Sequence, residues 1–140
     1  MSYLLDTCVI SELVKQRPDE KVIRWIDGVD ENKLFLSVLT LGELEKGIAR
    51  LPASVRKDDL QRWLEQDLAA RFAGRIIPID AGVAGTWGRM QGAAELTGVK
   101  LPVIDALMAA SAQVCQLTVV TRNVADFERC GMTVINPWAG

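Results

Sequence analysis

The chain has 140 residues, 49% of them hydrophobic, and a formal net charge of −2. This length and composition suffice for one domain whose core buries roughly two-thirds of the unfolded surface. The slightly acidic balance excludes a global electrostatic drive toward nucleic acid, so any polyanion contact must come from a local patch. The best candidate patch is interspersed with acids, which favours an ordinary solvated helix face. It comprises Lys46, Arg50, Arg56, Lys57 and Arg62.

Histidine is absent, and the three cysteines, Cys8, Cys115 and Cys130, are widely spaced. The absence of histidine excludes Ser-His-Asp hydrolysis, Cys-His proteolysis and His-ligated zinc sites. The cysteine spacing excludes a zinc ribbon and a thioredoxin-type motif, and their odd number fits a reducing cytoplasm. We find neither a signal peptide nor an apolar run near the ~20 residues that span a bilayer, so we expect a cytoplasmic protein without membrane contact.

Short apolar runs alternate with longer helical patterns along the chain. In chain order we expect a strand at 2–6, helices at 8–16 and 19–29, a strand at 33–37, helices at 38–50 and 53–73, a strand at 75–79, helices at 81–97 and 102–116, a strand at 117–121 and an edge strand at 132–135. Strands separated by helices imply right-handed crossovers and a parallel sheet covered on both faces. We therefore expect an α/β three-layer sandwich, a single domain over residues 1–140, with a central, mainly parallel sheet of about four or five strands.

Acidic residues stand where the apolar runs meet a turn or a helix start, at Asp6, Glu43, Asp105 and Asp126. The carboxyl ends of parallel strands converge on one crevice of an α/β sheet. Carboxylates packed there repel one another by kcal/mol amounts at a low effective dielectric constant, and a divalent cation removes that cost. The pattern therefore indicates a hydrolytic site that binds Mg²⁺ or Mn²⁺.

Each of these acids also has an ordinary structural interpretation. Asp6 suits the N-cap of the following helix, and Asp105 suits the first turn of a helix. Glu43 closes the capping box Thr40-Leu41-Gly42-Glu43, in which its side chain would reach back to the amide of Thr40. Asp126 could cap the next turn. Taken together, the four acids favour the metal interpretation.

Four segments, in their order and spacing, resemble the PIN domain, with the closest likeness to VapC-type ribonuclease toxins of bacterial toxin–antitoxin pairs. They are Leu4-Leu5-Asp6-Thr7, Ser37-Val38…Gly42-Glu43-Leu44, Asp105-Ala106-Leu107-Met108 and Thr121-Arg122-Asn123…Asp126-Phe127. The resemblance covers nearly the whole chain. It implies an endoribonuclease that depends on Mg²⁺ or Mn²⁺. It also implies a homodimer, neutralised by an antitoxin encoded beside it, within a larger toxin–antitoxin complex.

Carried over by motif, Asp6, Glu43 and Asp105 form the acidic triad that holds the cation. We expect Asp6 and Asp105 to be direct ligands, because Mg²⁺ usually takes only one or two protein carboxylates. Glu43 is then the residue that orients or deprotonates the attacking water.

The fourth acidic position of such domains falls on Asn123, and this departure weakens the case for a second metal ion. Asp126 supplies part of the missing charge or holds the loop. We expect Thr7, Thr121 and Arg122 to contact the RNA substrate. For Thr121 and Asn123 the alternative is a role behind the ligands, holding them in place.

Two other functions stay open. One is a different α/β phosphohydrolase with Asp6 as nucleophile, although the haloacid-dehalogenase pattern needs a second acid where Cys8 stands. The other is a catalytically silent PIN-fold binding module, which the intact triad disfavours and Asn123 leaves open. The large aromatic residues are expected mostly in the core, and the resemblance implies a groove for an antitoxin segment.

Overall fold

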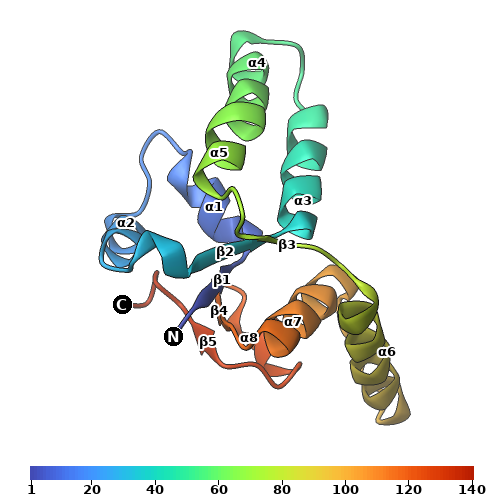
Figure 1. Cartoon of the computed structure of the whole chain (residues 1–140). Helices are drawn as coiled ribbons and strands as arrows, with labels where there is room; N and C mark the ends of the chain where they lie inside the picture. Colours follow the sequence, from blue (N-terminus) through green and yellow to red (C-terminus); the bar gives the residue numbers. More distant parts are fainter.

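The computed structural model describes residues 1–140 and centres on a five-stranded sheet (Figure 1). The strands are β1 (Tyr3–Leu5), β2 (Leu34–Ser37), β3 (Ile76–Ile77), β4 (Thr118–Val120) and β5 (Val134–Ile135). Their spatial order is β3-β2-β1-β4-β5, and every pairing is parallel. The expected parallel sheet is confirmed, with β1 at its centre.

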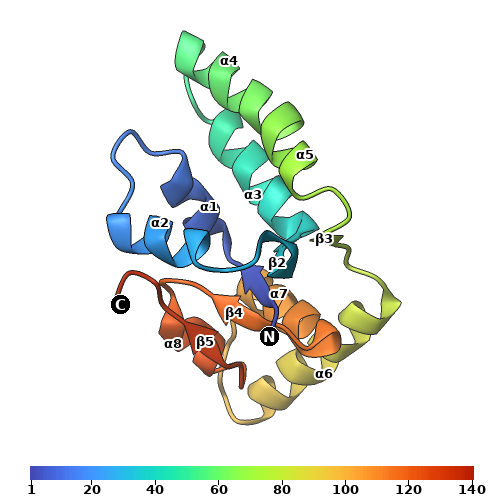
Figure 2. The same ribbon diagram turned by 60° about the vertical axis from the view of Figure 1, so that its left-hand side comes forward.

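Helices connect the strands and cover both faces of the sheet. They are α1 (Thr7–Leu13), α2 (Glu20–Asp27), the 3₁₀ turn η1 (Glu31–Lys33), α3 (Val38–Ala49), α4 (Val55–Arg62), the π-helical segment η2 (Trp63–Leu68), α5 (Ala69–Arg71), α6 (Ala81–Leu96), α7 (Val103–Cys115) and α8 (Val124–Glu128). Two views show α1, α3, α4 and α5 on one side of the sheet and α6, α7 and α8 on the other (Figures 1 and 2).

The core consists of two clusters, one on each face. Because successive side chains of a strand point to opposite faces, neighbouring residues of β1 and β4 enter different layers. Leu5 and Val120 pack with the cluster under α1–α4, whereas Leu4 and Val119 pack with the cluster under α6–α8. This alternation produces the expected three-layer sandwich.

The predicted helix at 53–73 is continuous in space but contains a π-helical segment. Leu64, Leu68 and Phe72 form a buried row at intervals of four residues. Four residues exceed the 3.6 of an α-helical turn, so the wider π turn keeps this row aligned with the core. Gly74, with φ +79°, ends the helix as predicted, because this left-handed conformation favours glycine.

Two elements escaped the sequence analysis, η1 and α8. Both are too short for a hydrophobic period to appear, and α8 buries only Phe127. The large aromatic side chains lie mostly in the core, as expected. Phe72 is fully buried, and Trp25, Trp63 and Trp87 pack against the two clusters. Every helix is too short or too polar to cross a bilayer.

Candidate active site

The neighbouring strands β2, β1 and β4 end at one edge of the sheet, beside a cavity of about 360 Å³. Asp6 directly follows β1, Glu43 lies in the second turn of α3, and Asp105 lies in the first turn of α7. The fold thus brings the three predicted carboxylates to one cavity from three separate elements. The cavity is lined by Asp6, Thr7, Cys8, Ser11, Glu12, Lys15, Glu43, Asp105, Arg122, Asn123 and Trp138.

Asp6 is both an N-cap and part of the cavity wall. Its side chain is buried, and Oδ1 accepts a 2.8 Å hydrogen bond from the backbone N–H of Thr7 at the start of α1. Oδ2 accepts a 2.7 Å hydrogen bond from the hydroxyl of Thr121. A carboxylate has about four acceptor positions, so these bonds fix its orientation and leave capacity for a further ligand.

The capping-box interpretation of Glu43 is wrong. The N-cap of α3 is Ser37, whose Oγ accepts a 3.0 Å hydrogen bond from the N–H of Leu39. The helix therefore starts before Thr40, which lies buried inside it. The Oε1 atom of Glu43 instead accepts a 2.6 Å hydrogen bond from the hydroxyl of Thr7. Glu43 consequently points to the cavity edge, and its other oxygen receives no protein hydrogen bond.

Asp105 is the cavity carboxylate whose pKa is raised well above its ordinary value. Its pKa is raised to about 6, first by burial and then by the negative charges of Asp6, Asp126 and Glu43, in that order. None of the ion pairs of the structure includes Asp6, Glu43 or Asp105. The three carboxylates therefore share a partly dehydrated region without a basic partner, a situation that favours bound cations.

Of the predicted substrate contacts, Thr7 and Arg122 line the cavity but Thr121 does not. Thr121 is fully buried; it donates to Asp6 and accepts a 2.9 Å hydrogen bond from the N–H of Asn123. Direct contact between Thr121 and RNA is therefore wrong, and the alternative of a role behind the ligands agrees with its contacts. Asn123 lines the cavity and makes no side-chain cap bond to α8.

Asp126 lies behind the cavity rather than in its wall. It does not cap α8, because the N-cap position is Asn123 and Asp126 lies inside the first turn, where it forms a 3.6 Å ion pair with Arg129. Its charge nevertheless reaches Asp105, whose pKa it raises. Of the expected roles for Asp126, supplying negative charge near the site agrees best with this placement.

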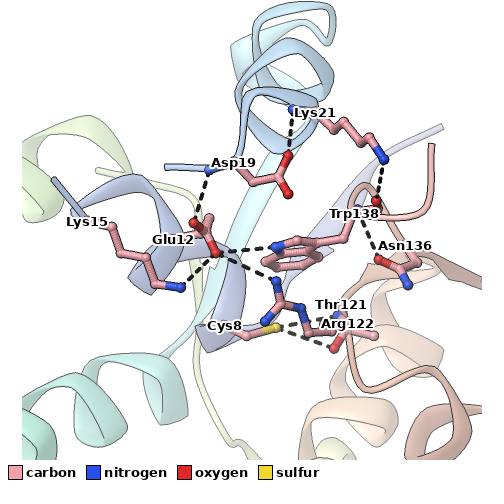
Figure 3. Close-up of polar contacts among 9 residues, drawn as sticks. All are labelled: Cys8, Glu12, Lys15, Asp19, Lys21, Thr121, Arg122, Asn136 and Trp138. Atoms are coloured by element: carbon pink, nitrogen blue, oxygen red, sulfur yellow. Dashed lines mark hydrogen bonds and ion pairs between the residues drawn. The ribbon is translucent and has the colours of Figure 1, made fainter. Parts of the chain in front are cut away.

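Glu12 is a site residue that the sequence analysis missed. Its side chain is only 5% exposed, although it lines the cavity, and its polar partners surround it (Figure 3). The hydrogen bond from Lys15 lowers the pKa of Glu12 most, and those from the N–H of Asp19 and the indole of Trp138 add to this effect, although burial opposes it. The sequence feature that could have identified Glu12 is its position as a carboxylate inside the apolar run that ends at Leu13. Glu12 lies one helical turn beyond Cys8, which also lines the cavity.

The donor atoms fit a hard divalent cation in an open site. Asp6, Glu43 and Asp105 supply carboxylate oxygen, the ligand type that Mg²⁺ and Mn²⁺ prefer. No three Asp, Glu, Cys or His side chains converge closely enough to form a ready-made cage. Because Mg²⁺ keeps several water ligands and takes one or two carboxylates, a complete protein cage is not required.

Comparisons with known proteins decide the family. The PIN-domain family model matches residues 3–131. This chain belongs to the PIN-domain family. It is 38% identical to the toxin FitB of Neisseria gonorrhoeae over 135 residues, which cover 96% of this chain and 97% of FitB. It is 37% identical to the VapC ribonuclease Y4jK of Sinorhizobium fredii, with 96% of each chain covered. These relatives confirm the resemblance to VapC-type proteins.

A solved structure agrees with the fold. The crystal structure of FitAcB from Neisseria gonorrhoeae superposes with a TM-score of 0.91 at 38% identity. The match covers 97% of this chain and 98% of the other. The predicted PIN-like fold is confirmed.

Proposed function

We propose that this PIN-domain protein is a metal-dependent endoribonuclease and acts as the toxin of a toxin–antitoxin pair. The observation that carries the proposal is the placement of Asp6, Glu43 and Asp105 around one cavity, with no basic side chain paired to any of them. Relatives named as a toxin and as a VapC ribonuclease support this activity.

Asp6 and Asp105 would hold Mg²⁺ or Mn²⁺, with Glu43 beside it. When bound, such a cation lowers the pKa of a coordinated water and offsets the charge of the phosphate. Oε1 of Glu43 is held by Thr7, so Oε2 is available to take a proton from the attacking water. Arg122 and Asn123 at the cavity wall would bind the RNA backbone.

The partner proposal follows the relatives. We expect this chain to form a homodimer, to bind a cognate antitoxin and to assemble with it into a larger complex. Exposed apolar side chains at the starts of α3 and α7 support a protein contact there: Val38 is 37% exposed, Val103 52% and Ile104 38%.

Cleavage of a labelled single-stranded RNA by the purified protein tests the activity. We expect cleavage with Mg²⁺ or Mn²⁺, none in EDTA, and a loss of several orders of magnitude in Asp6→Asn. Expression in a bacterium should arrest growth, and the antitoxin encoded beside it should restore growth. Equal growth of cells expressing wild type and Asp6→Asn, at matched soluble expression, would overturn the toxin proposal.

A catalytically silent binding module is the remaining alternative, which the intact triad disfavours and Asn123 at the fourth acidic position leaves open. Calorimetric titration with Mn²⁺ separates the two functions. An intact fold that neither binds the ion nor cleaves RNA would support the silent module. Membership in the PIN family leaves the alternative with Asp6 as a phosphohydrolase nucleophile without support.

A further inference from the structure

The cavity contains a fourth carboxylate, Glu12, whose situation differs from that of the other three. Oε1 accepts hydrogen bonds from Lys15 Nζ at 3.0 Å and from Trp138 Nε1 at 3.2 Å. Oε2 accepts a 3.1 Å hydrogen bond from the N–H of Asp19. Arg122 Nη2 lies 3.9 Å from Oε1 (Figure 3). Because these donors compensate the negative charge of Glu12, it is a poor ligand for a cation. It is instead suited to hold the side chains that donate to it in place.

The group that Glu12 anchors is the indole of Trp138, on the turn that follows β5. The N–H of Trp138 donates a 3.0 Å hydrogen bond to Oδ1 of Asn136, and its carbonyl accepts a 3.5 Å bond from Lys21 of α2. Trp138 is thus held by its backbone and by its indole N–H. Its ring is a fixed surface at the wall of the cavity.

The guanidinium of Arg122 stacks on that surface, with its central carbon 4.4 Å from the centre of the Trp138 ring. The side chain of Arg122 is otherwise 54% exposed. A stacked guanidinium engages the ring through its face, so its N–H edges stay available for the bidentate bonds that suit phosphate. The contact with Glu12, at 3.9 Å, is long enough to yield to a phosphate oxygen.

We infer that Glu12 and Trp138 are positioning residues that hold Arg122 at the cavity wall as a phosphate-binding arm for the RNA backbone. The inference rests on the proposed ribonuclease function and deepens it. Asp6, Glu43 and Asp105 repel a polyanion, so the approach of RNA to them requires a positive group held nearby. Arg122 and Lys15 are the two basic residues of the cavity wall, and the same Glu12 carboxylate organises both.

The test measures RNA binding separately from cleavage. A short labelled single-stranded RNA of mixed sequence is titrated with the Asp6→Asn protein in EDTA, at several salt concentrations, by fluorescence anisotropy. Loss of one phosphate contact should lower the slope of log affinity against log salt by about 0.7. We expect this change in Arg122→Ala, with an affinity loss of about tenfold. Arg89→Ala removes an exposed positive charge from α6, outside the cavity wall, and should leave the slope unchanged.

The positioning role is tested through Trp138. Trp138→Ala should reproduce the slope change of Arg122→Ala, and the double variant should show no larger change than either alone. Trp138→Phe keeps a ring beneath the guanidinium and should retain most of the slope. Glu12→Gln keeps an acceptor for the indole N–H and should also retain it, whereas Glu12→Ala should not. All variants are compared at a temperature at which each is folded.

Cleavage kinetics of the same substitutions in the metal-loaded protein complete the test. A positioning role for Trp138 predicts a rise of about tenfold in KM with little change in kcat, because the arm binds the backbone and does not touch the reacting atoms. Additive losses in the double variant, or slopes that match Arg89→Ala, would overturn the inference while leaving the ribonuclease intact. Absence of cleavage by the folded wild-type protein would overturn both.

Discussion

The hydroxyl of Thr7 donates a 2.6 Å hydrogen bond to the carboxylate of Glu43, which joins the start of α1 to α3. The same hydroxyl lies 3.0 Å from that of Thr40. Short bonds to ionised acceptors are stronger than neutral ones and restrict the carboxylate to one orientation. The residue proposed to activate water therefore has one oxygen fixed by the protein.

Removal of this hydroxyl should impair catalysis and leave the protein folded. In Thr7→Val we expect kcat for RNA cleavage to fall about tenfold, because a misplaced catalytic group loses its alignment with the reacting atoms. The free energy of unfolding should change by no more than about 1–3 kcal/mol. Thr7→Ser keeps the hydroxyl and should behave nearly as wild type. Equal kcat values for Thr7→Val and Thr7→Ser would show that the bond does not orient Glu43 for catalysis.

Two substitutions separate the helix-capping role of Ser37 from the catalytic role proposed for Glu43. Ser37→Ala removes the observed N-cap of α3 and should cost about 1 kcal/mol of stability, with kcat unchanged. Glu43→Gln should reduce cleavage by orders of magnitude and leave the melting temperature within a few degrees. Denaturant unfolding and single-turnover cleavage measure the two effects. A large stability loss in Glu43→Gln would contradict its placement in the site.

The raised pKa of Asp105 predicts a pH-dependent stability of the metal-free protein. Its pKa of about 6 in the folded state lies above its ordinary value of 3.8, so the folded state binds the proton more tightly than the unfolded state. This tighter proton binding stabilises the folded metal-free protein. The stabilisation is complete below the unfolded pKa of Asp105 and is lost as the pH rises through about 6. Asp105→Asn should therefore gain stability relative to wild type across this window.

Melting temperatures of both proteins in EDTA, over a pH series, check this expectation. The difference between Asp105→Asn and wild type should grow with pH and level off above the folded pKa. Addition of Mg²⁺ should reverse its sign, because the cation stabilises the ionised carboxylate of the wild type. A pH-independent difference would mean that Asp105 does not experience the repulsion assigned to it.

Cation binding itself should raise the melting temperature. A ligand at a hundred times its Kd stabilises the folded state by about 2.7 kcal/mol. We expect a shift with Mg²⁺ or Mn²⁺ in wild type, and none in the Asp6→Asn, Asp105→Asn double variant. Glu12→Gln is the matched control, because Glu12 lines the same cavity but already has basic partners. If Glu12→Gln abolished the shift and the double variant kept it, the ligand assignment would be reversed.

The sequence predicted the sheet well because each strand is a short apolar run flanked by turn residues. The expected strand at 75–79 is longer than β3 (Ile76–Ile77), since only residues in register with β2 join the ladder. The expected helix at 38–50 agrees with α3, whereas the capping-box interpretation put the N-cap of this helix at Thr40. Ser37 and Thr40 both carry N-cap hydroxyls, and only the end of β2 at Ser37 selects the first.

The site was predictable where chemistry is local and not where it depends on distant contacts. Asp6 follows β1, and Glu43 and Asp105 lie in the first two turns of α3 and α7, so their convergence follows from topology. The role inferred for Glu12 depends on its hydrogen bond from Trp138, which lies 126 residues away in the chain. No local pattern reports such a contact. The burial of Thr121 likewise depends on packing between β4 and the rest of the sheet.

The central position of β1 has a consequence for the order in which the protein becomes active. Asp6 obtains its backbone partner, the carbonyl of Val120, and its side-chain partner, the hydroxyl of Thr121, from the last sixth of the chain. A growing polypeptide on the ribosome lacks both until synthesis is nearly finished, and pairing of such distant segments is late in folding. The contacts that hold Asp6 in place therefore form only when the chain is almost complete, so the site is assembled at the end of synthesis and not during it.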